Sequence, residues 1–511
     1  MARIERQLTI WSELERELPP GLEEVRDFVD TLSEFDEKLV RELELERARE
    51  TEPGKPMVRG RGRDDLPVRA MWNLLATSLY LRNGKQSETL AELRRNSDLA
   101  RLLGFRELAP NIYRLPSSSA LSRFHVKLKD RANVRELFNG TVAALAEENP
   151  DFGKHTAIDA SDVRTHARAK KVRTEDTEAT PKTEESAAVE QAGREVVSQQ
   201  GGEAASVEEA EGGKEKTTSS DPDASWSVKT KTWEGTNGEE RKTTKSTFGF
   251  KMYLDTDTTI PGIVSVEVET GSYSDSKKAL PMIDSGLERL PAGRRETVAM
   301  DKGFDSEDNV RGAWERDIVA IVPVREVPKK LDQLPKEDRE EAIEPGSNIV
   351  RDKYTGEVAC YDAKPSASAS ENENENVPTR RTMTYAGAEI DRSSHKFRCP
   401  LGATAKDECP FFDSCKAGPA GSQGRQVRIS FKTDIRRFAP IYPRSKRWKR
   451  LYNGRSAVER INSYAKEVLP LERHALRGKA AIELRVLLVA MTINVRTINS
   501  LRHAKVLANA A

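Results

Sequence analysis

The order of strand and helix patterns between residues 297 and 323 constrains the fold of this chain more than any other feature. A short apolar run ends at Asp301, Gly303 permits a tight turn, a helical pattern follows, and a second apolar run covers residues 318–323. This order predicts a strand–helix–strand unit of a parallel sheet. Open α/β sheets place their sites at the carboxyl ends of strands, so Asp301 is a candidate site residue.

A second apolar run also ends in an aspartate, much earlier in the chain. Residues 156–158 precede Asp159, which predicts a buried strand with this carboxylate at its carboxyl end. On its own, an aspartate in this position is more often structural than functional. Residues 248–255 and 263–268 alternate around the turn signal Pro261-Gly262 and predict an antiparallel hairpin.

The segment from residue 452 to residue 468 has the pattern of a helix. Asn453-Gly454 is a turn signal, and Ser456 can cap the helix that follows. Four apolar residues recur at helical spacing and share one face. They are Val458, Ile461, Ala465 and Val468.

The same helix carries three charged residues on one side. Arg455, Glu459 and Lys466 fall within about 40° of each other, because four residues advance about 400° and seven about 700°. Two cations and a carboxylate on one stripe suit a site that holds a metal ion and a polyanion. A solvated face with i,i+4 ion pairs is the more common explanation for such a pattern in isolation.

The spacing Tyr-x2-Arg-x3-Glu-x6-Lys resembles the signature of a group of bacterial and archaeal insertion-sequence transposases, the DDE transposases with a YREK motif. It is formed by Tyr452, Arg455, Glu459 and Lys466. The string Met-Asp-Lys-Gly-Phe-Asp-Ser at residues 300–306 resembles the second catalytic motif of that family, and Asp159 resembles its first catalytic aspartate. The resemblance covers roughly residues 66–172 and 226–500, less an insertion.

This resemblance implies an α/β fold: an RNase H-like mixed sheet flanked by helices, with an all-α N-terminal domain and a Cys-containing insertion. It implies binding of terminal inverted repeats, DNA cleavage and strand transfer by a homodimer that holds two transposon ends. Asp159, Asp301 and Glu459 would be the catalytic ligands of two Mg²⁺ or Mn²⁺ ions. Tyr452, Arg455 and Lys466 would hold phosphates near the cleaved end.

Three domains are predicted, and the last of them carries two insertions. Residues 1–65 form a charged helical extension and linker, and residues 66–150 a helical domain to which the resemblance assigns DNA binding and dimerisation. Residues 151–511 form the catalytic domain. It is interrupted by an acidic insertion, residues 173–225, and by a Cys-containing insertion, residues 324–440.

Charge is distributed unevenly along a chain whose formal net charge is only +1. Residues 175–224 carry 14 acidic and 4 basic residues, and their polar composition predicts a disordered insertion. Residues 421–511 carry 20 basic and 5 acidic residues. This predicts a local polyanion-binding surface, or a basic solvated helix bundle.

Aromatic residues are interleaved with cations just before the candidate helix. The segment 438–452 includes Arg447 and Trp448, which precede Tyr452. Rings among cations are typical of surfaces that hold unpaired nucleotides, so Arg447 and Trp448 are candidate DNA-binding residues. The alternative is one amphipathic edge of the domain.

All four cysteines lie in the second insertion. Cys399 and Cys409 each precede a proline, as the knuckles of metal sites often do, but the spacing is not that of a standard zinc motif. Two hypotheses follow: a structural zinc site, or reduced thiols in a small subdomain. The four are Cys360, Cys399, Cys409 and Cys415.

Other functional classes remain open from sequence. A transposase-derived DNA-binding protein without activity, a non-transposing nuclease with the same core, and a zinc-dependent DNA-binding regulator would share parts of these patterns. The chain begins with a charged helical pattern instead of an apolar signal segment, so a cytoplasmic protein is expected. The resemblance implies that it is prokaryotic and nucleoid-associated.

Overall fold

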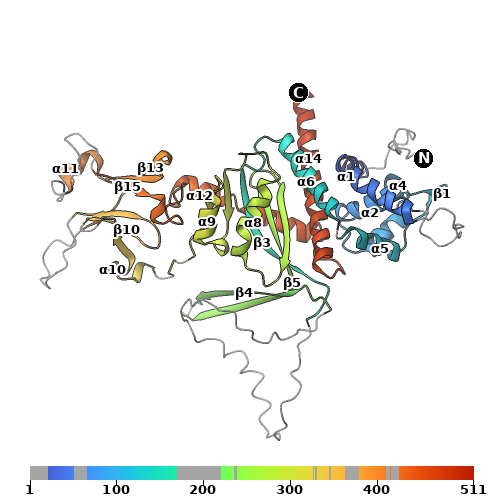
Figure 1. Ribbon diagram of the computed structural model, residues 1–511, viewed down its shortest axis with the longest axis horizontal. Helices are drawn as coiled ribbons and strands as arrows, with labels where there is room; N and C mark the ends of the chain where they lie inside the picture. The colour runs from blue at the N-terminus through green and yellow to red at the C-terminus, as the bar shows by residue number, and fades with distance from the viewer. Residues whose placement is uncertain are drawn as a thin grey trace, which may run out of the picture.

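The computed structural model describes residues 21–50, 66–129, 131–169, 220–234, 239–325, 327–328, 331–344, 347–362, 379–409, 412, 415 and 425–510 (Figure 1). Three predicted segments therefore lie outside the described residues in whole or in large part. These are residues 51–65 of the N-terminal extension and linker, most of the acidic insertion, and residues 363–378 of the Cys-containing insertion.

The N-terminal region consists of helices with one short hairpin. Within the predicted helical domain, the segment 86–102 forms two helices, because Asn96 adopts an extended conformation and its side chain accepts the N–H of Leu99. The prediction of an all-α region is incomplete, since two short strands follow the fourth helix. The elements are α1 (Glu23–Glu50), α2 (Val68–Tyr80), α3 (Gln86–Arg95), α4 (Ser97–Leu102), β1 (Glu107–Ala109), β2 (Ile112–Tyr113), α5 (Ser118–Leu128) and α6 (Ala132–Glu148).

A mixed sheet forms the centre of the molecule, which confirms the α/β prediction. Its strands follow the order β4–β5–β3–β7–β8, and β6 also pairs with β5. β3, β7 and β8 are parallel, whereas β5 runs antiparallel to β3, β4 and β6. The strands are β3 (His155–Arg164), β4 (Ser225–Glu234), β5 (Glu240–Asp257), β6 (Ile263–Thr270), β7 (Thr297–Met300) and β8 (Val319–Ile321).

Helices cover both faces of this sheet. α8 (Asp275–Leu287) and α9 (Glu307–Trp314) pack on one face, and α9 connects β7 to β8 as predicted. α13 (Ser456–Ser463) and α14 (Lys479–Ala510) pack on the other face. α14 also contacts α1, α2 and α6, so the N-terminal helices and the sheet share one hydrophobic core (Figure 1).

Two strand predictions are corrected by the structure. β3 continues five residues past Asp159 to Arg164, because β5 is long enough to pair with it to that point. The acidic insertion was expected to reach residue 225, with the strands resuming at Phe248. Instead β4 begins at Ser225 and β5 at Glu240.

The second insertion contains two small antiparallel sheets. One consists of β9 (Glu340–Ala342), β10 (Ile349–Asp352), β11 (Val358–Tyr361) and β12 (Arg380–Thr382). The other consists of β13 (Thr384–Glu389), β14 (Ser394–Arg398) and β15 (Gln426–Ser430). The short helices α10 (Lys336–Arg339) and α11 (Ala405–Glu408) complete the insertion.

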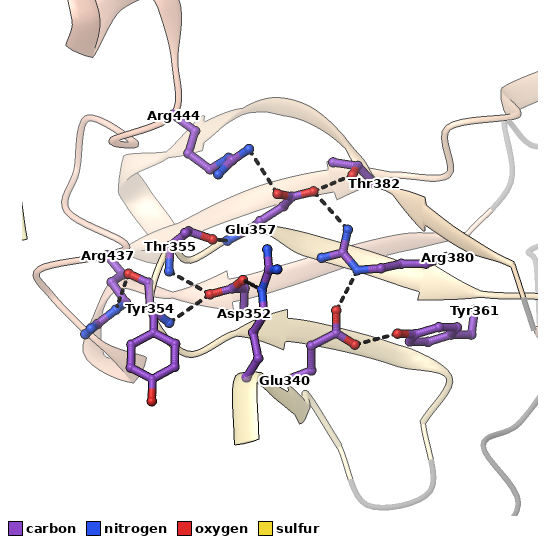
Figure 2. Close-up of polar contacts among 11 residues, drawn as sticks. Glu340, Asp352, Tyr354, Thr355, Glu357, Tyr361, Arg380, Thr382, Arg437 and Arg444 are labelled. Atoms are coloured by element: carbon purple, nitrogen blue, oxygen red, sulfur yellow. Dashed lines mark hydrogen bonds and ion pairs between the residues drawn. The ribbon is translucent and has the colours of Figure 1, made fainter. Parts of the chain in front are cut away.

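A network of charged residues joins the first small sheet to the chain that leaves the insertion (Figure 2). Glu357 pairs with Arg380 at 3.1 Å and with Arg444 at 3.0 Å, and Glu340 pairs with Arg380 at 2.5 Å. Arg437 donates to the carbonyl of Tyr354 at 3.0 Å. Because Arg444 lies just before α12 (Lys446–Asn453), this network links the first small sheet to the chain that enters that basic helix.

Candidate functional site

Asp159 and Asp301 are brought side by side by the register of two parallel strands. Ile158 of β3 lies opposite Met300 of β7, so the next residue of each strand is one of the aspartates. Neighbouring strands are about 4.8 Å apart. Two carboxylates that are far apart in the sequence therefore lie at the same point of the sheet.

The turn after β7 holds the carboxylate of Asp301. One oxygen of Asp301 accepts the backbone N–H of Gly303 at 2.5 Å, within the 3₁₀ turn Lys302–Phe304. A Cβ atom at Gly303 would lie only 2.7 Å from that oxygen. Any other residue at position 303 would therefore displace the carboxylate.

Helix α13 places Glu459 and Asn462 beside the strands. Val458 and Ile461 are buried on the face that packs on β3 and β5. Asn462 lies one helical turn after Glu459 and donates to a carboxylate oxygen of Asp159 at 3.2 Å. Sequence analysis missed Asn462; its position three residues after Glu459 on the buried side of the helix was the available signal.

Arg455 lies between two of the candidate carboxylates. Its guanidinium is 2.6 Å from Oε1 of Glu459 and 4.0 Å from Oδ1 of Asp159. The backbone of Gly454 and Arg455 stays in the right-handed helical region, so Ser456 does not form the predicted cap. Its hydroxyl instead accepts a hydrogen bond from Arg460 at 3.0 Å.

The electrostatics of Asp159 reflect an excess of negative charge. Burial and the nearby charge of Asp301 raise the pKa of Asp159 to about 6, against the lowering effect of Arg455. Glu459 adds a smaller contribution in the same direction as Asp301. An ionised Asp159 is therefore disfavoured unless another cation approaches.

The donor set suits a hard divalent cation, because Mg²⁺ and Mn²⁺ prefer carboxylate oxygens. In the described part of the chain, however, no group of three histidine, cysteine, aspartate or glutamate side chains is placed to hold a metal ion as it stands. The ion pair with Arg455 explains the position of Glu459. The two aspartates fit a cation, and Glu459 would have to leave Arg455 to join them.

Lys466 does not follow the predicted helical stripe. After Ser463 the helix widens into a π-helical segment, Tyr464–Val468, which changes the phase of every later side chain. Lys466 donates to the carbonyl of Asp162 at 2.5 Å and lies 3.3 Å from Glu472. The same change of phase buries Leu469 completely, whereas Val468, predicted on the apolar face, is only half-buried.

Trp448, Tyr452 and Arg455 form a continuous stack along α12 and the start of α13. The rings of Trp448 and Tyr452 are stacked with centroids 5.0 Å apart, and the guanidinium of Arg455 lies 5.8 Å from the ring centre of Tyr452. Arg447 is exposed, has no ion pair within the described residues, and lines a hollow with Thr297 and Tyr385. The stack thus brings together Trp448, Tyr452 and Arg455, whereas Arg447 and Lys466 lie outside it.

The four cysteines come from separate segments but affect each other electrostatically. Burial, together with the nearby thiols of Cys399, Cys415 and Cys409, raises the pKa of Cys360 to about 12. Even so, no three described cysteine, histidine or carboxylate side chains are arranged to hold a metal ion. The described geometry brings the thiols near each other, and the zinc site and the reduced thiols both stay hypotheses.

The fold and this site define an α/β protein in which two strands and a helix bring three carboxylates and an arginine to one edge of a mixed sheet. A family model described as the transposase DDE domain matches residues 150–495. This match covers more than half of the chain, which therefore belongs to the DDE-domain transposase family and has DNA as its implied partner. No match was found among curated proteins or among solved structures. Among the described helices, none is long and apolar enough to cross a membrane.

Proposed function

We propose that this protein is the transposase of a prokaryotic insertion sequence, and that within its family it belongs to the group with the YREK signature. It binds the terminal inverted repeats of the element, cleaves DNA there, and transfers the freed strands to a target. The observation that carries this proposal is that Asp159 and Asp301 lie side by side, each following one of the paired residues Ile158 and Met300. α13, which carries Glu459, packs beside them.

The order of the central strands supports an RNase H-like core. An antiparallel meander, β6–β5–β3, continues into two parallel strands, β7 and β8, with helices on both faces. The aspartates lie on the first strand of the meander and after the first parallel strand that follows it. A helix from the end of the chain then supplies the third carboxylate.

In this proposal Asp159, Asp301 and Glu459 hold two Mg²⁺ or Mn²⁺ ions. Such ions activate a water or a 3′-hydroxyl and neutralise the leaving oxygen of a phosphodiester. The chain itself positions the groups: Gly303 fixes Asp301, and Asn462 fixes Asp159. Arg455 neutralises Glu459 before the ions bind, and afterwards becomes available to a phosphate.

The stack of Trp448, Tyr452 and Arg455 binds DNA next to the carboxylates in this proposal. Four cations of α12 are exposed, and none of them pairs with a carboxylate within the described residues. They are Lys446, Arg447, Lys449 and Arg450. Lys466 holds the end of β3 through the carbonyl of Asp162, so its effect on phosphate contacts would be indirect.

The test is nicking and strand joining on DNA that carries the element's own ends, with Mg²⁺ or Mn²⁺. Asp159→Ala, Asp301→Ala and Glu459→Ala should each lower the rate by on the order of 10³-fold, because each removes a ligand of ions worth several kcal/mol in the transition state. Asp308→Asn, an exposed change on α9, is the matched control and should stay within about twofold of wild type. The size of the DNA complex would show whether two chains hold two ends.

Two outcomes would redirect the proposal. If all three alanine variants retain activity, the carboxylate assignment is wrong. If wild type binds the ends but never cleaves them, the chain is a transposase derivative that only binds DNA.

Two hypotheses remain for the cysteines, and they differ in metal content. A structural zinc site predicts about one zinc per chain, lost in Cys399→Ser, together with a lower melting temperature after chelation. Reduced thiols predict no zinc and four thiols that a reagent titrates in the unfolded protein. A zinc-dependent regulator would in addition lose DNA binding on chelation while remaining indifferent to Asp301→Ala.

A further inference from the structure

The outer part of β5 forms a two-stranded ribbon with β4 that projects from the central sheet (Figure 1). β3 pairs with residues 249–257 of β5, whereas β4 pairs with residues 240–249. The ribbon therefore begins where β3 ends. It continues in the direction in which β3 and β7 run, which is the side of the sheet on which Asp301 lies.

The ribbon has the length of one turn of duplex DNA. Its ten cross-strand pairs run from Ser225–Gly249 to Glu234–Glu240. Its nine residue-to-residue steps of about 3.4 Å make about 30 Å, close to the roughly 34 Å of one helical turn. A two-stranded ribbon is also narrow enough to enter the major groove.

One face of the ribbon carries uncompensated positive charge. Lys229 lies directly opposite Lys245, and Arg241 lies further out on the same face of β5. We call these three residues the basic face. Like charges directly opposite each other destabilise a strand pair, so this arrangement favours an anionic partner.

Only the inner end of the basic face is neutralised within the described residues. Lys229 lies 3.0 Å from Asp162 of β3 but remains 48% exposed, and Ser227 donates to the same carboxylate at 2.8 Å. Lys245 and Arg241 are exposed, and no described carboxylate pairs with them. The three glutamates of the ribbon sequence, at positions 234, 239 and 240, are confined to its outer end.

The base of the ribbon is fixed by contacts on its other face. Trp226 packs against Phe248 with ring centroids 5.3 Å apart, and the hydroxyls of Thr230 and Thr244 are 3.2 Å apart. These contacts keep the two strands aligned as they leave the sheet. The ribbon is thus a supported arm with its cations presented on one side.

We propose that the basic face binds the phosphates of double-stranded DNA that leaves the candidate active site, over about one helical turn. This inference rests on the proposed function, since it assumes that the carboxylates act on DNA. It adds a duplex-binding surface outside the stack of Trp448, Tyr452 and Arg455. The geometry supports it through the position, length and charge of the ribbon.

The first experiment measures the salt dependence of DNA binding by an Arg241→Gln/Lys245→Gln double variant. Each lost phosphate contact lowers the slope of log affinity against log salt by about 0.9, so the slope should fall by about 2. Affinity at moderate salt should fall on the order of tenfold, equally for specific and unrelated sequences. Lys154→Gln removes a half-buried cation, 3.4 Å from Glu296, that lies just before β3 at the opposite end of the sheet, and it should change neither quantity.

The second experiment shortens the ribbon. Residues 231–243 are replaced by Asn-Gly, which joins the paired residues Thr230 and Thr244 through a two-residue hairpin turn. The variant loses the outer four of the ten cross-strand pairs, about 14 Å, so wild type should protect about half a turn more of duplex from hydroxyl radicals than this variant does. A melting temperature close to that of wild type would show that the core is intact.

Unchanged salt slope and unchanged protection in both variants would overturn the ribbon inference, even while wild type cleaves normally. Loss of dimerisation with normal DNA affinity would also overturn it, because the ribbon would then bind a second copy through Trp226 and Val228. The proposed function fails by a different result, which is the absence of metal-dependent cleavage by wild type on any end substrate.

Discussion

Two arginine–carboxylate groups lie on opposite faces of the same part of the central sheet, and their charges balance differently. Asp255 of β5 is the cross-strand partner of Ile158, the residue before Asp159. Asp255 pairs with Arg295, and both side chains are fully buried. On the other face, Asp159 shares Arg455 with Glu459 and also lies near Asp301.

The two groups differ in the number of carboxylates per arginine and in their exposure to solvent. One carboxylate with one arginine is neutral and closed to solvent, so it can only support the fold. Three carboxylates with one arginine have charge to spare, and the side chain of Asp159 remains 20% exposed. The excess of acid, and not the presence of an arginine–carboxylate pair, marks the place where cations are expected.

We call Arg295 and Asp255 the closed pair, and Asp159, Asp301, Glu459 and Arg455 the open group. The largest expected effect on stability concerns the closed pair. Arg295→Met leaves the charge of Asp255 buried and unpaired, so the free energy of unfolding should fall by about 3–5 kcal/mol. Guanidinium denaturation followed by circular dichroism measures this change. Arg455→Met, the matching change in the open group, should lower stability by less than about 1 kcal/mol, because Glu459 is half exposed.

If Arg455→Met lowers the free energy of unfolding as much as Arg295→Met does, the open group is as important to the fold as the closed pair, and the distinction between them is wrong. A double variant of the closed pair tests whether the unpaired charge causes the loss. Arg295→Met combined with Asp255→Leu should recover much of the lost stability, because no unpaired charge remains.

The second-largest expected effect is a gain in stability when the charge of Asp159 is removed. The pKa of Asp159 is raised to about 6 in the folded protein, from an ordinary value of 3.8. Stability linked to this group is therefore greatest when it is protonated and is lost as the pH rises through about 6. In metal-free protein at pH 7.5, Asp159→Asn should raise the free energy of unfolding by on the order of 2 kcal/mol, and the gain should vanish near pH 4.

Asp162, three residues further along β3, is the matched control. Burial raises its pKa, but hydrogen bonds from Ser227 and Lys229 more than offset this, and the net pKa is lowered. Its contribution to stability is present above the ordinary pKa and is lost as the pH falls. Asp162→Asn should therefore destabilise the protein at pH 7.5, and a gain in both variants would contradict the assignment of excess charge to Asp159 alone.

The parts of this arrangement that sequence predicts are those set by local pattern. The run before Asp301, the turn at Gly303 and the periodicity around Val458 each depend on neighbouring residues, and the structure has the expected strand, turn and helix there. These elements place two of the three carboxylates.

The parts that sequence misses depend on distant residues. β4 is rich in Ser, Thr and Lys, so no apolar run marks it in the sequence. β3 extends past Asp159 only because β5 pairs with it there. The π-helical segment around Lys466 and the bond from Asn462 to Asp159 are likewise invisible to helical periodicity, because they reflect how α13 meets the sheet.

The smallest effect concerns the pH dependence of metal binding at the open group. A cation competes with the proton on Asp159, so the affinity for Mn²⁺ should be constant above about pH 6.5 and fall by up to tenfold per pH unit below about pH 6. Electron paramagnetic resonance of free Mn²⁺ measures this without DNA. Asp159→Asn should bind more weakly and lose most of this dependence, whereas Asp162→Asn should keep it. If the affinity of wild type for Mn²⁺ does not depend on pH, the cation binds away from Asp159. The excess negative charge of the open group would then not serve to bind a cation, and this proposed difference from the closed pair would be wrong.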